Sequence, residues 1–412
     1  MKNEPLRIAI AGLGTVGGGV VRMLQRNGAL IAARAGRPIE VVALSARSRS
    51  RDRGFDISAY EWEDDPVALA RRSDIDLVVE VIGGEDGPAR AAAGAALGSG
   101  KHLVTANKAM LARHGQALAE AAEAAGVALR FEAAVAGGIP VVKALTEGLA
   151  GNAITRLMGV MNGTCNYILT RMEAEDAPYE AVLEEAKRLG YAEADPSFDV
   201  GGIDAAQKLA LLAATAFGTR VDYGAISVEG IERVSLADIE HAAELGYRIK
   251  LLGVARAAPG GVEARMQPCL VPAGSPIGQL EGVTNMVVIE GDFVGRIVLS
   301  GPGAGEGPTA SAIVQQFWDQ YSTLIDRIYT ALDKTVRLVT PIGTLLGIAY
   351  GIYHKWQYSR SRMHIHIRSF LERDNPRLET TRDNLKELHK PPGAARDISE
   401  TIFASAEVQR SR

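Results

Sequence analysis

Several features that define other classes of protein are scarce in this chain of 412 residues. Its two cysteines, Cys165 and Cys269, lie far apart in the sequence, which excludes a disulfide framework and favours a reducing compartment. The polar residues 1–5 precede only a short apolar run, so no secretory pattern is visible. A formal net charge of −4 does not suggest a nucleic-acid partner. We therefore expect a cytoplasmic enzyme, and residues 1–314 are ample for two domains with proper cores.

Apolar runs alternate with alanine-rich helical segments in the first third of the chain. Helices are expected over residues 88–97 and 108–125, and strands over 6–11, 41–45, 76–82, 102–105 and 127–132. Strands that alternate with helices are typical of a parallel, doubly wound sheet. The sequence therefore predicts an α/β fold whose first domain spans residues 1–132.

The pattern changes after Ile139. Helices are expected over residues 141–149, 179–189 and 205–217, and strands over 155–161, 249–255, 287–290 and 293–299. Gly291-Asp292, between the last two strands, is typical of a hairpin turn. We therefore expect a second, α+β domain over residues 133–300, after which residues 301–314 complete the first domain.

A glycine-rich motif, Gly12-Leu13-Gly14-Thr15-Val16-Gly17, follows the first expected strand and precedes an amphipathic segment. This is G-x-G-x-x-G in the strand–turn–helix context that dinucleotide binding requires. The first glycine permits the tight turn, the second lets a pyrophosphate approach the backbone, and the third lets the helix pack on the strand. Unpaired N–H groups at the helix N-terminus attract the phosphates. The motif predicts a Rossmann-type cofactor domain, and the alternative is an ordinary Gly-rich turn.

The end of the second expected strand indicates which dinucleotide binds. NAD-selective folds usually place an acid there to hold the ribose 2′-hydroxyl. This chain has Ser45-Ala46-Arg47-Ser48-Arg49-Ser50-Arg51 instead, with no acid. Because guanidinium groups bind phosphate in a bidentate manner, Arg47 and Arg49 favour the 2′-phosphate of NADP, with NAD as the alternative cofactor. A solvated basic loop is the alternative without a ligand.

A loop that leads into an apolar helix carries four acids and one lysine between Glu193 and Lys208. Asp204 and Lys208 are four residues apart, so they share one face of the helix. A catalytic lysine needs a fixed position and a partner that steers its proton, and an aspartate one turn away supplies both. Lys208 and Asp204 are therefore candidate catalytic residues, and the alternative is a surface ion pair.

Six stretches of the chain together resemble the homoserine dehydrogenase family, from residue 6 to about residue 314. They are the glycine-rich motif at 12–17, TANK at 105–108, FEAAVAGGIP at 131–140, NGTCN at 162–166, the acidic loop and helix at 190–208, and residues 301–311. The first occurs in many dehydrogenases, whereas the others in this order are highly specific. The resemblance implies reversible NAD(P)-linked reduction of L-aspartate 4-semialdehyde to L-homoserine, in threonine and methionine biosynthesis.

The resemblance also implies a role for individual residues. Lys208 is implied as the proton donor with Asp204 beside it, and Lys108 is implied between nicotinamide and substrate. Glu193 is implied to bind the substrate through its ammonium group, and Asp199 is implied as another acid of the pocket. Residues implied to line the nicotinamide and substrate pocket are Thr105, Asn162, Gly163, Thr164 and Gly303. Hydride attack develops negative charge on the aldehyde oxygen, so a nearby ammonium group stabilises that charge and delivers a proton.

A monovalent cation, usually sodium, is implied within residues 131–140. In the family, the position of Glu132 and the backbone carbonyls at Val135, Gly137 and Ile139 hold this ion. The alternative is a Gly-rich turn whose glutamate caps a helix. The resemblance further implies that the domain over residues 133–300 binds substrate and forms a homodimer or homotetramer.

The resemblance ends near residue 314, and residues 315–412 are an unrecognised, atypical tail expected to be largely helical. Its segment 338–353 has no charge, and Gly343, Gly347 and Gly351 repeat at a spacing that membrane helices use to pack. The segment is nevertheless shorter than the roughly 20 residues needed to span a bilayer. Three interpretations stay open: a membrane-associated helix, a buried or oligomer-forming helix, and a non-native end.

Two functions from different classes follow from these patterns. The first is an NAD(P)-dependent oxidoreductase that acts on the CH–OH group of homoserine. The second is a non-catalytic or membrane-tethered scaffold that keeps the dehydrogenase fold. The presence of Lys108, Glu193, Asp204 and Lys208 favours the first, since a non-catalytic descendant need not retain them.

Overall fold

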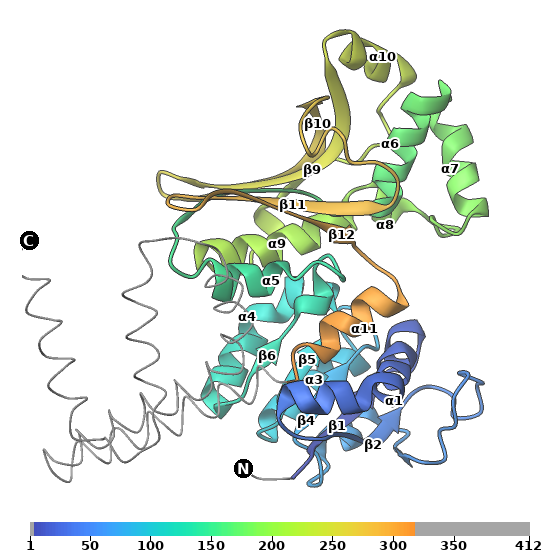
Figure 1. Ribbon diagram of the computed structural model, residues 1–412, viewed down its shortest axis with the longest axis vertical. Helices are drawn as coiled ribbons and strands as arrows, with labels where there is room; N and C mark the ends of the chain where they lie inside the picture. Colours follow the sequence, from blue (N-terminus) through green and yellow to red (C-terminus); the bar gives the residue numbers. More distant parts are fainter. Residues whose placement is uncertain (1–3, 318–412) are drawn as a thin grey trace, which may run out of the picture. The chain divides into compact units, whose positions relative to one another are not determined.

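The computed structural model describes residues 4–317, and a six-stranded sheet forms its N-terminal part (Figure 1). The strands are β1 (Leu6–Ala11), β2 (Ile39–Ser45), β3 (Glu61–Trp62), β4 (Leu77–Glu80), β5 (His102–Thr105) and β6 (Leu129–Arg130). Their order is β3-β2-β1-β4-β5-β6, and every neighbouring pair is parallel. The carboxyl ends of all six strands therefore lie at one edge of the sheet.

Alternate side chains of the first sheet face two different layers of helices. The helices are α1 (Thr15–Ala35), α2 (Pro66–Arg71), α3 (Pro88–Gly98), α4 (Lys108–Ala125) and α11 (Glu306–Val314). Ala9 and Ala11 of β1 share a buried cluster with α2, α3 and α4, whereas Ile8 and Ile10 share another with α1 and α11. This confirms the doubly wound parallel sheet that the sequence predicts.

Helix α11 comes from the far end of the described residues and packs with α1. Ala310 and Ile313 of α11 are buried in the same cluster as Val20 of α1. Arg22 and Glu306 also join the two helices through an ion pair of 2.7 Å. The chain thus returns to the first sheet after it has formed the second.

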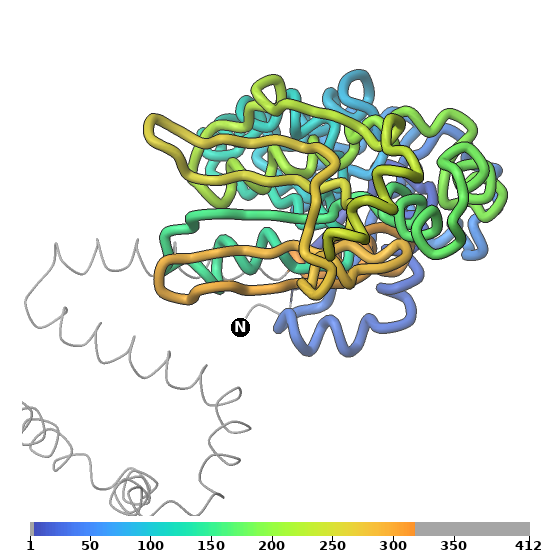
Figure 2. Tube along the Cα trace, turned by 90° about the horizontal axis from the view of Figure 1, so that it is seen from above, coloured from blue at the N-terminus to red at the C-terminus, as the bar shows by residue number. Residues whose placement is uncertain are grey.

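The second sheet is largely antiparallel, as is typical of an α+β domain. Its strands are β7 (Ile154–Val160), β8 (Ser227–Val228), β9 (Tyr247–Ala258), β10 (Gly261–Pro272), β11 (Thr284–Gly291) and β12 (Gly295–Pro302). The order is β12-β11-β7-β9-β10-β8, and all pairs are antiparallel except β8 with β10. Figure 2 shows β7 between the β9–β10 and β11–β12 hairpins.

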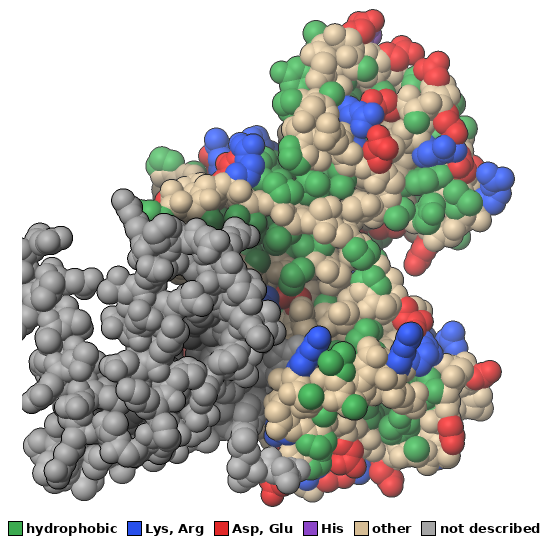
Figure 3. All heavy atoms as spheres, viewed as in Figure 1, with side chains coloured by type: hydrophobic (Ala, Val, Ile, Leu, Met, Phe, Trp, Pro, Cys, Tyr) green, Lys and Arg blue, Asp and Glu red, His purple; other side chains and the backbone are tan. Residues whose placement is uncertain are grey.

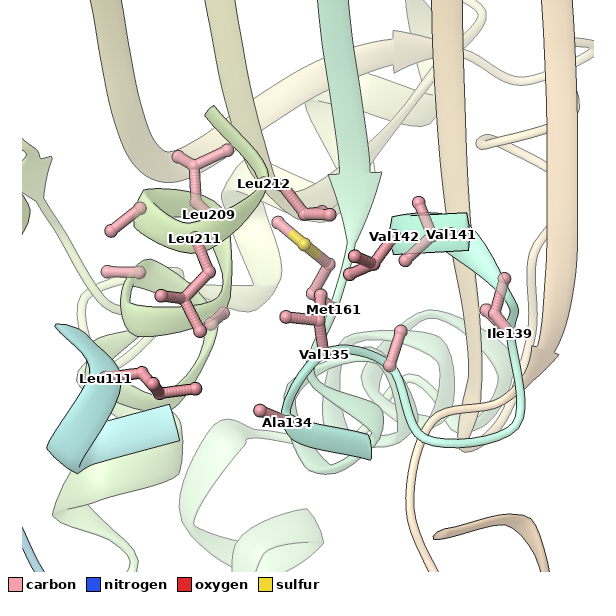
Figure 4. Close-up of a cluster of buried hydrophobic side chains, with 14 of the residues drawn as sticks. Leu111, Ala134, Val135, Ile139, Val141, Val142, Met161, Leu209, Leu211 and Leu212 are labelled. Carbon is pink, nitrogen blue, oxygen red and sulfur yellow. The ribbon is translucent and has the colours of Figure 1, made fainter. Parts of the chain in front are cut away.

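Helix α9 lies at the centre of the buried core that joins the two sheets. The remaining helical elements are η1 (Glu132–Ala134), α5 (Val141–Lys143), the π-helix η2 (Ala144–Gly148), α6 (Gly163–Glu175), α7 (Tyr179–Arg188), α8 (Ser197–Val200), α9 (Ile203–Phe217), η3 (Tyr223–Ala225) and α10 (Leu236–Glu244). Leu209 and Leu212 of α9 belong to the same cluster as Leu157 of β7 and Leu111 of α4. Figure 4 shows the α9 leucines on one side of this cluster and Val135 beside Met161. Burial on both sides of α9 fixes the helix that carries Asp204 and Lys208.

The structure confirms the predicted hairpin between β11 and β12 but gives it a longer loop. Gly291 pairs with Gly295, so the loop holds three residues and does not turn at Gly291-Asp292. The Asp292 carboxylate accepts hydrogen bonds from the backbone N–H groups of Phe293 and Ala153, which stabilises the longer loop. Phe293, expected at the start of a strand, is 88% exposed.

Other elements also differ from the expectation, among them α6 and α10, which were not predicted. The helix expected over residues 141–149 is the short α5 followed by the π-helix η2. Strand β10 was not predicted either, and it carries Pro268, a residue that is unfavourable in a central strand, in its second half. The strand tolerates Pro268 because β8 pairs, among the described residues, only with Arg265 and Met266.

Charged side chains of both signs are interspersed over the face of the described residues seen in Figure 3. Within residues 4–317, no helix is both long enough and apolar enough to cross a bilayer. The segment 338–353, for which the sequence left three interpretations open, lies outside the described residues.

Candidate active site

Lys208 and Asp204 form a buried ion pair on α9. The Lys208 Nζ atom lies 2.7 Å from Asp204 Oδ2 and donates a second hydrogen bond of 2.7 Å to the Met161 carbonyl oxygen. The two residues are only 8% and 6% exposed, respectively. The i,i+4 spacing therefore does place them on one face, and the alternative of a surface pair is wrong.

Two side chains from other elements converge on the same carboxylate. Lys108 Nζ lies 3.1 Å from Asp204 Oδ1. The Asn162 side-chain amide donates to Asp204 Oδ2 at 3.0 Å and to Asp199 Oδ1 at 2.8 Å. The structure thus brings Lys108, Asp199, Asp204 and Lys208 into one cluster around Asn162.

Helix caps explain how the local sequence holds these side chains. Asn107 caps the N-terminus of α4 through a hydrogen bond from the Met110 N–H group, so Lys108 is the first residue of that helix. Asn162 caps α6 in the same way through the Cys165 N–H group, and its amide then remains free to donate to the two aspartates. The cap of α4 thus fixes the position of Lys108, and the cap of α6 fixes the side-chain amide of Asn162 in the cluster.

The charges of the cluster act in opposite directions on its two aspartates. Burial alone would raise the pKa of Asp204, but the ammonium groups of Lys208 and Lys108 outweigh burial and lower this pKa to about 2. Burial raises the pKa of Asp199, and the hydrogen bond from Asn162 offsets it only in part. Asp204 therefore stays ionised between two ammonium groups.

The lowered pKa of Asp204 predicts how stability changes in acid. A carboxylate whose pKa is lowered in the folded state stabilises the fold fully above its ordinary value of 3.8, and this contribution is lost as the pH falls toward 2. From pH 5 to pH 2, we expect the free energy of unfolding to fall by roughly 2 kcal/mol more in the wild type than in Asp204→Asn. Urea unfolding at several pH values measures this difference, and an equal pH dependence would contradict it.

Glu193 lies apart from the hydrogen-bonded cluster. Its side chain is exposed and has no hydrogen bond or ion pair within residues 4–317. Phe198 is 41% exposed, and its ring centroid lies 5.7 Å from Lys108 Nζ. Within the described residues, no hydrogen bond or ion pair therefore joins Glu193, which is predicted to bind the substrate, to the cluster around Asn162.

The glycine-rich turn has the space that a dinucleotide requires. A Cβ atom at Gly12, where φ is +104°, would lie 2.5 Å from the Val81 carbonyl oxygen, and one at Gly17 would lie 2.0 Å from that of Gly12. Gly14 faces open space, and no side chain caps the N-terminus of α1, which begins at Thr15 and Val16. These residues fit a pyrophosphate at the N–H groups of the helix.

Gly303 has a packing reason of its own. A Cβ atom at this position would lie 2.0 Å from the side-chain nitrogen of Asn285, which is buried. The absence of a side chain is therefore required whether or not Gly303 contacts a cofactor.

The arginine-rich loop after β2 is organised by residues that the sequence analysis missed. Arg47 and Arg49 are exposed, and the Arg49 guanidinium lies 5.9 Å from the centre of the Trp62 ring. Arg53 lies 5.7 Å from the same ring and donates to the carbonyl oxygens of Leu13, Ser48, Arg49 and Arg51. Trp62 lies outside the arginine-rich loop in the sequence, so only the fold reveals its contacts with Arg49 and Arg53.

The predicted cation site contains a helix cap. The Glu132 carboxylate accepts hydrogen bonds from the backbone N–H groups of Val142 at 2.9 Å and Lys143 at 2.8 Å. The Ile139 carbonyl accepts from the Val141 N–H group, and Gly137 has a positive φ of 24°. These contacts match the alternative in which the glutamate caps a helix, and the cation itself stays a prediction.

Comparison with known proteins relates this chain to one family. A sequence model described as "Homoserine dehydrogenase" matches residues 140–317, and one described as "Homoserine dehydrogenase, NAD binding domain" matches residues 12–132. The homoserine dehydrogenase of Neisseria gonorrhoeae is 46% identical over 316 residues, which cover 77% of this chain and 72% of that protein. That of Bacillus subtilis is 40% identical over 375 residues, or 89% of this chain and 82% of that protein.

Solved structures agree with the sequence relatives. The crystal structure of a homoserine dehydrogenase from Thiobacillus denitrificans has 46% sequence identity and a TM-score of 0.75, and the match covers 80% of this chain and 74% of that one. A hyperthermophilic archaeal homoserine dehydrogenase in complex with NADPH has 26% identity and a TM-score of 0.65, with coverage of 77% and 98%. On these matches, the chain belongs to the homoserine dehydrogenase family.

Proposed function

We propose that this chain catalyses the reversible NAD(P)-linked reduction of L-aspartate 4-semialdehyde to L-homoserine, with Lys208 as the proton donor. Membership of the family supports the reaction, and the buried cluster of Lys208, Asp204 and Lys108 supports the site. The single observation that carries the proposal is the Lys208 ammonium group, held 2.7 Å from Asp204 at the meeting point of α4, α6 and α9. A non-catalytic scaffold would have no need of a buried lysine and a second, partly buried lysine on one carboxylate.

The chemistry of the residues fits carbonyl reduction. Bound nicotinamide supplies the hydride, and accepts it in the reverse direction. Lys208 holds a proton at Nζ and gives it to the aldehyde oxygen as negative charge develops there. Asp204 orients the Lys208 ammonium group through its Oδ2 atom. Lys108 places a second positive charge beside the other carboxylate oxygen of Asp204, Oδ1.

The substrate carries an ammonium group, for which we propose Glu193 and Asp199. Glu193 has an exposed carboxylate without a bonded partner in the described residues, so it is available to a ligand. Asp199 accepts from Asn162 through one oxygen, Oδ1. Thr105 and Gly303 are proposed to line the nicotinamide side of the pocket, as the family resemblance implies.

Further proposals concern the cofactor and the ion. NADP is favoured by Arg47 and Arg49, which lie on the loop after β2 with no acid at the end of that strand. A monovalent cation is proposed at Glu132 and the carbonyls of Val135, Gly137 and Ile139. Cytoplasmic location and a homodimer or homotetramer stay predictions.

The cofactor proposal predicts a selective loss of affinity. Replacing Arg47 and Arg49 together with Ala should weaken NADPH binding far more than NADH binding, because each lost charge-assisted contact with phosphate costs about 1.5–3 kcal/mol. Titration of each cofactor by fluorescence measures the effect. Arg90→Ala serves as the control and should change neither affinity. Arg90 is a surface residue of α3 that pairs with Asp86, which precedes the helix. Equal loss for both cofactors would show that the two arginines do not read the 2′-phosphate.

The proposed reaction is tested by the consumption of NADPH with L-aspartate 4-semialdehyde. Succinic semialdehyde has the same aldehyde and carboxylate but lacks the ammonium group, so it is the matched control substrate. We expect rapid turnover of the first and weak turnover of the second. Equal turnover of both would contradict the proposed binding of the substrate ammonium group by the acids.

A further inference from the structure

Glu80 is a buried acid that belongs to none of the sequence motifs and has no role in the proposed chemistry. It is the last residue of β4, at the carboxyl edge of the first sheet, and its exposed fraction is 0%. Its Oε1 atom accepts hydrogen bonds from the backbone N–H groups of Ile82 at 2.8 Å and Gly83 at 3.4 Å. Its Oε2 atom accepts from the Thr105 hydroxyl at 2.5 Å. One carboxylate thus joins the loop after β4 to the end of β5.

The hydrogen bonds continue from Thr105 to the start of α4. The Thr105 hydroxyl oxygen accepts from the Asn107 N–H group at 3.0 Å. The side-chain amide nitrogen of Asn107 donates to the Gly84 carbonyl oxygen at 2.7 Å, which closes a ring back to the loop after β4. Its amide oxygen accepts from Met110 and caps the helix.

The residue that follows this ring is Lys108. It is the first residue of α4, and its ammonium group lies 3.1 Å from Asp204. The direction in which α4 begins is therefore set by the Asn107 cap, and the cap is set by Thr105 and Glu80. Lys108 thus follows directly in sequence on the hydrogen-bonded ring that Glu80 closes.

This hydrogen-bonded ring requires, at position 80, a side chain whose two terminal atoms both accept hydrogen bonds. The donors at Ile82, Gly83 and Thr105 all point at the carboxylate oxygens. A glutamine amide would place its NH₂ group either against two backbone N–H groups or against the Thr105 hydroxyl. That hydroxyl already accepts from Asn107, so it would lose its own acceptor. Burial raises the pKa of Glu80, and the hydrogen bonds from Thr105 and the backbone offset this only in part.

We propose that Glu80 is a positioning residue for the reaction, whose carboxylate orders the β4 and β5 edge loops so that Lys108 is held on Asp204. The inference rests on the proposed function and deepens it, because it adds a residue that touches neither substrate nor cofactor. Misplacement of a reacting group by about 1 Å can cost about 100-fold in rate even when the substituted residue is remote.

The test is a double-mutant cycle between Glu80→Gln and Lys108→Met in the full chain. Glu80→Gln alone should lower kcat about 10- to 100-fold, with the Kd for NADPH within about threefold of wild type. In the Lys108→Met background the same substitution should change kcat less than about twofold, because the residue through which it acts is already gone. If Glu80→Gln lowers kcat by the same factor in the wild-type and Lys108→Met backgrounds, the proposal is overturned. It is also overturned if the Glu80→Gln single mutant has a kcat within twofold of wild type.

Asp76→Asn is the matched control. Asp76 precedes β4 at the opposite edge of the same sheet, where it accepts three hydrogen bonds from Arg7. Its substitution should lower the melting temperature and leave kcat unchanged. If Asp76→Asn lowers kcat as much as Glu80→Gln does, the effect is general loss of sheet stability and the positioning role is wrong.

A second pair of variants keeps the proposal testable if Glu80→Gln does not fold. Thr105→Val removes the hydroxyl that links Glu80 to Asn107, and Thr105→Ser keeps it. We expect Thr105→Val to lower kcat with the same coupling to Lys108→Met and with the Kd for NADPH within about threefold of wild type, and we expect the conservative Thr105→Ser to restore most of kcat. Equal activity of the two would overturn the proposal. Wild type without activity on aspartate semialdehyde would overturn the proposed function, and this inference with it.

Discussion

Lys208→Met is expected to lower kcat by at least about 1,000-fold and to leave the Kd for NADPH nearly unchanged. The ammonium group is proposed to act on the oxygen that gains charge during reduction, whereas the proposed cofactor site lies at the carboxyl ends of the strands of the first sheet. Methionine keeps much of the apolar volume of the lysine stem, so the core around α9 should stay packed. Steady-state rates with aspartate semialdehyde and NADPH titrations give the two numbers.

Lys187→Met provides the control for this substitution. Lys187 lies on α7 in an exposed pair with Glu184, and it should tolerate the same change with full activity. A Lys208→Met enzyme within tenfold of wild type would remove Lys208 from the proposed role. The proton would then have to come from Lys108 or from water.

Asp204→Asn should produce the second largest effect. It removes the charge that Lys208 and Lys108 share, so two ammonium groups lose their common buried partner. Loss of one member of a buried ion pair costs about 3–5 kcal/mol of stability, and we expect kcat to fall about 100-fold or more in addition. Thermal unfolding and steady-state rates measured well below the melting temperature separate the two effects.

The control for Asp204→Asn is Glu290→Gln, which breaks an exposed pair with Arg296 on the second sheet. It should change stability by less than about 1 kcal/mol and leave kcat alone. If Asp204→Asn folds and keeps wild-type kcat, the carboxylate does not direct the Lys208 proton and has a structural role only.

The sequence predicted the parts of the site that depend on local spacing. Asp204 and Lys208 are one helical turn apart, and Gly12 to Gly17 form a turn between a strand and a helix. Both patterns follow from the geometry of a single element, so no knowledge of the fold was needed.

Contacts between distant elements could not be predicted in the same way. Glu80 ends a strand, and only the pairing of β4 with β5 shows that it bonds Thr105. Trp62 lies on the short edge strand β3, and only the fold brings it beside Arg49 and Arg53. The π-helix after α5 was also beyond local patterns, because residues 141–149 read as an ordinary helix.

The most direct test of the account follows a label from cofactor to product in a single turnover. Full-length enzyme is mixed with L-aspartate 4-semialdehyde and NADPH that carries deuterium at the transferred position, and the product is analysed by mass spectrometry. We expect L-homoserine with one deuterium at C4 from the wild type, and none in the same time from Lys208→Met with bound NADPH. Homoserine without the label, or labelled homoserine formed equally fast by both proteins, would contradict this expectation.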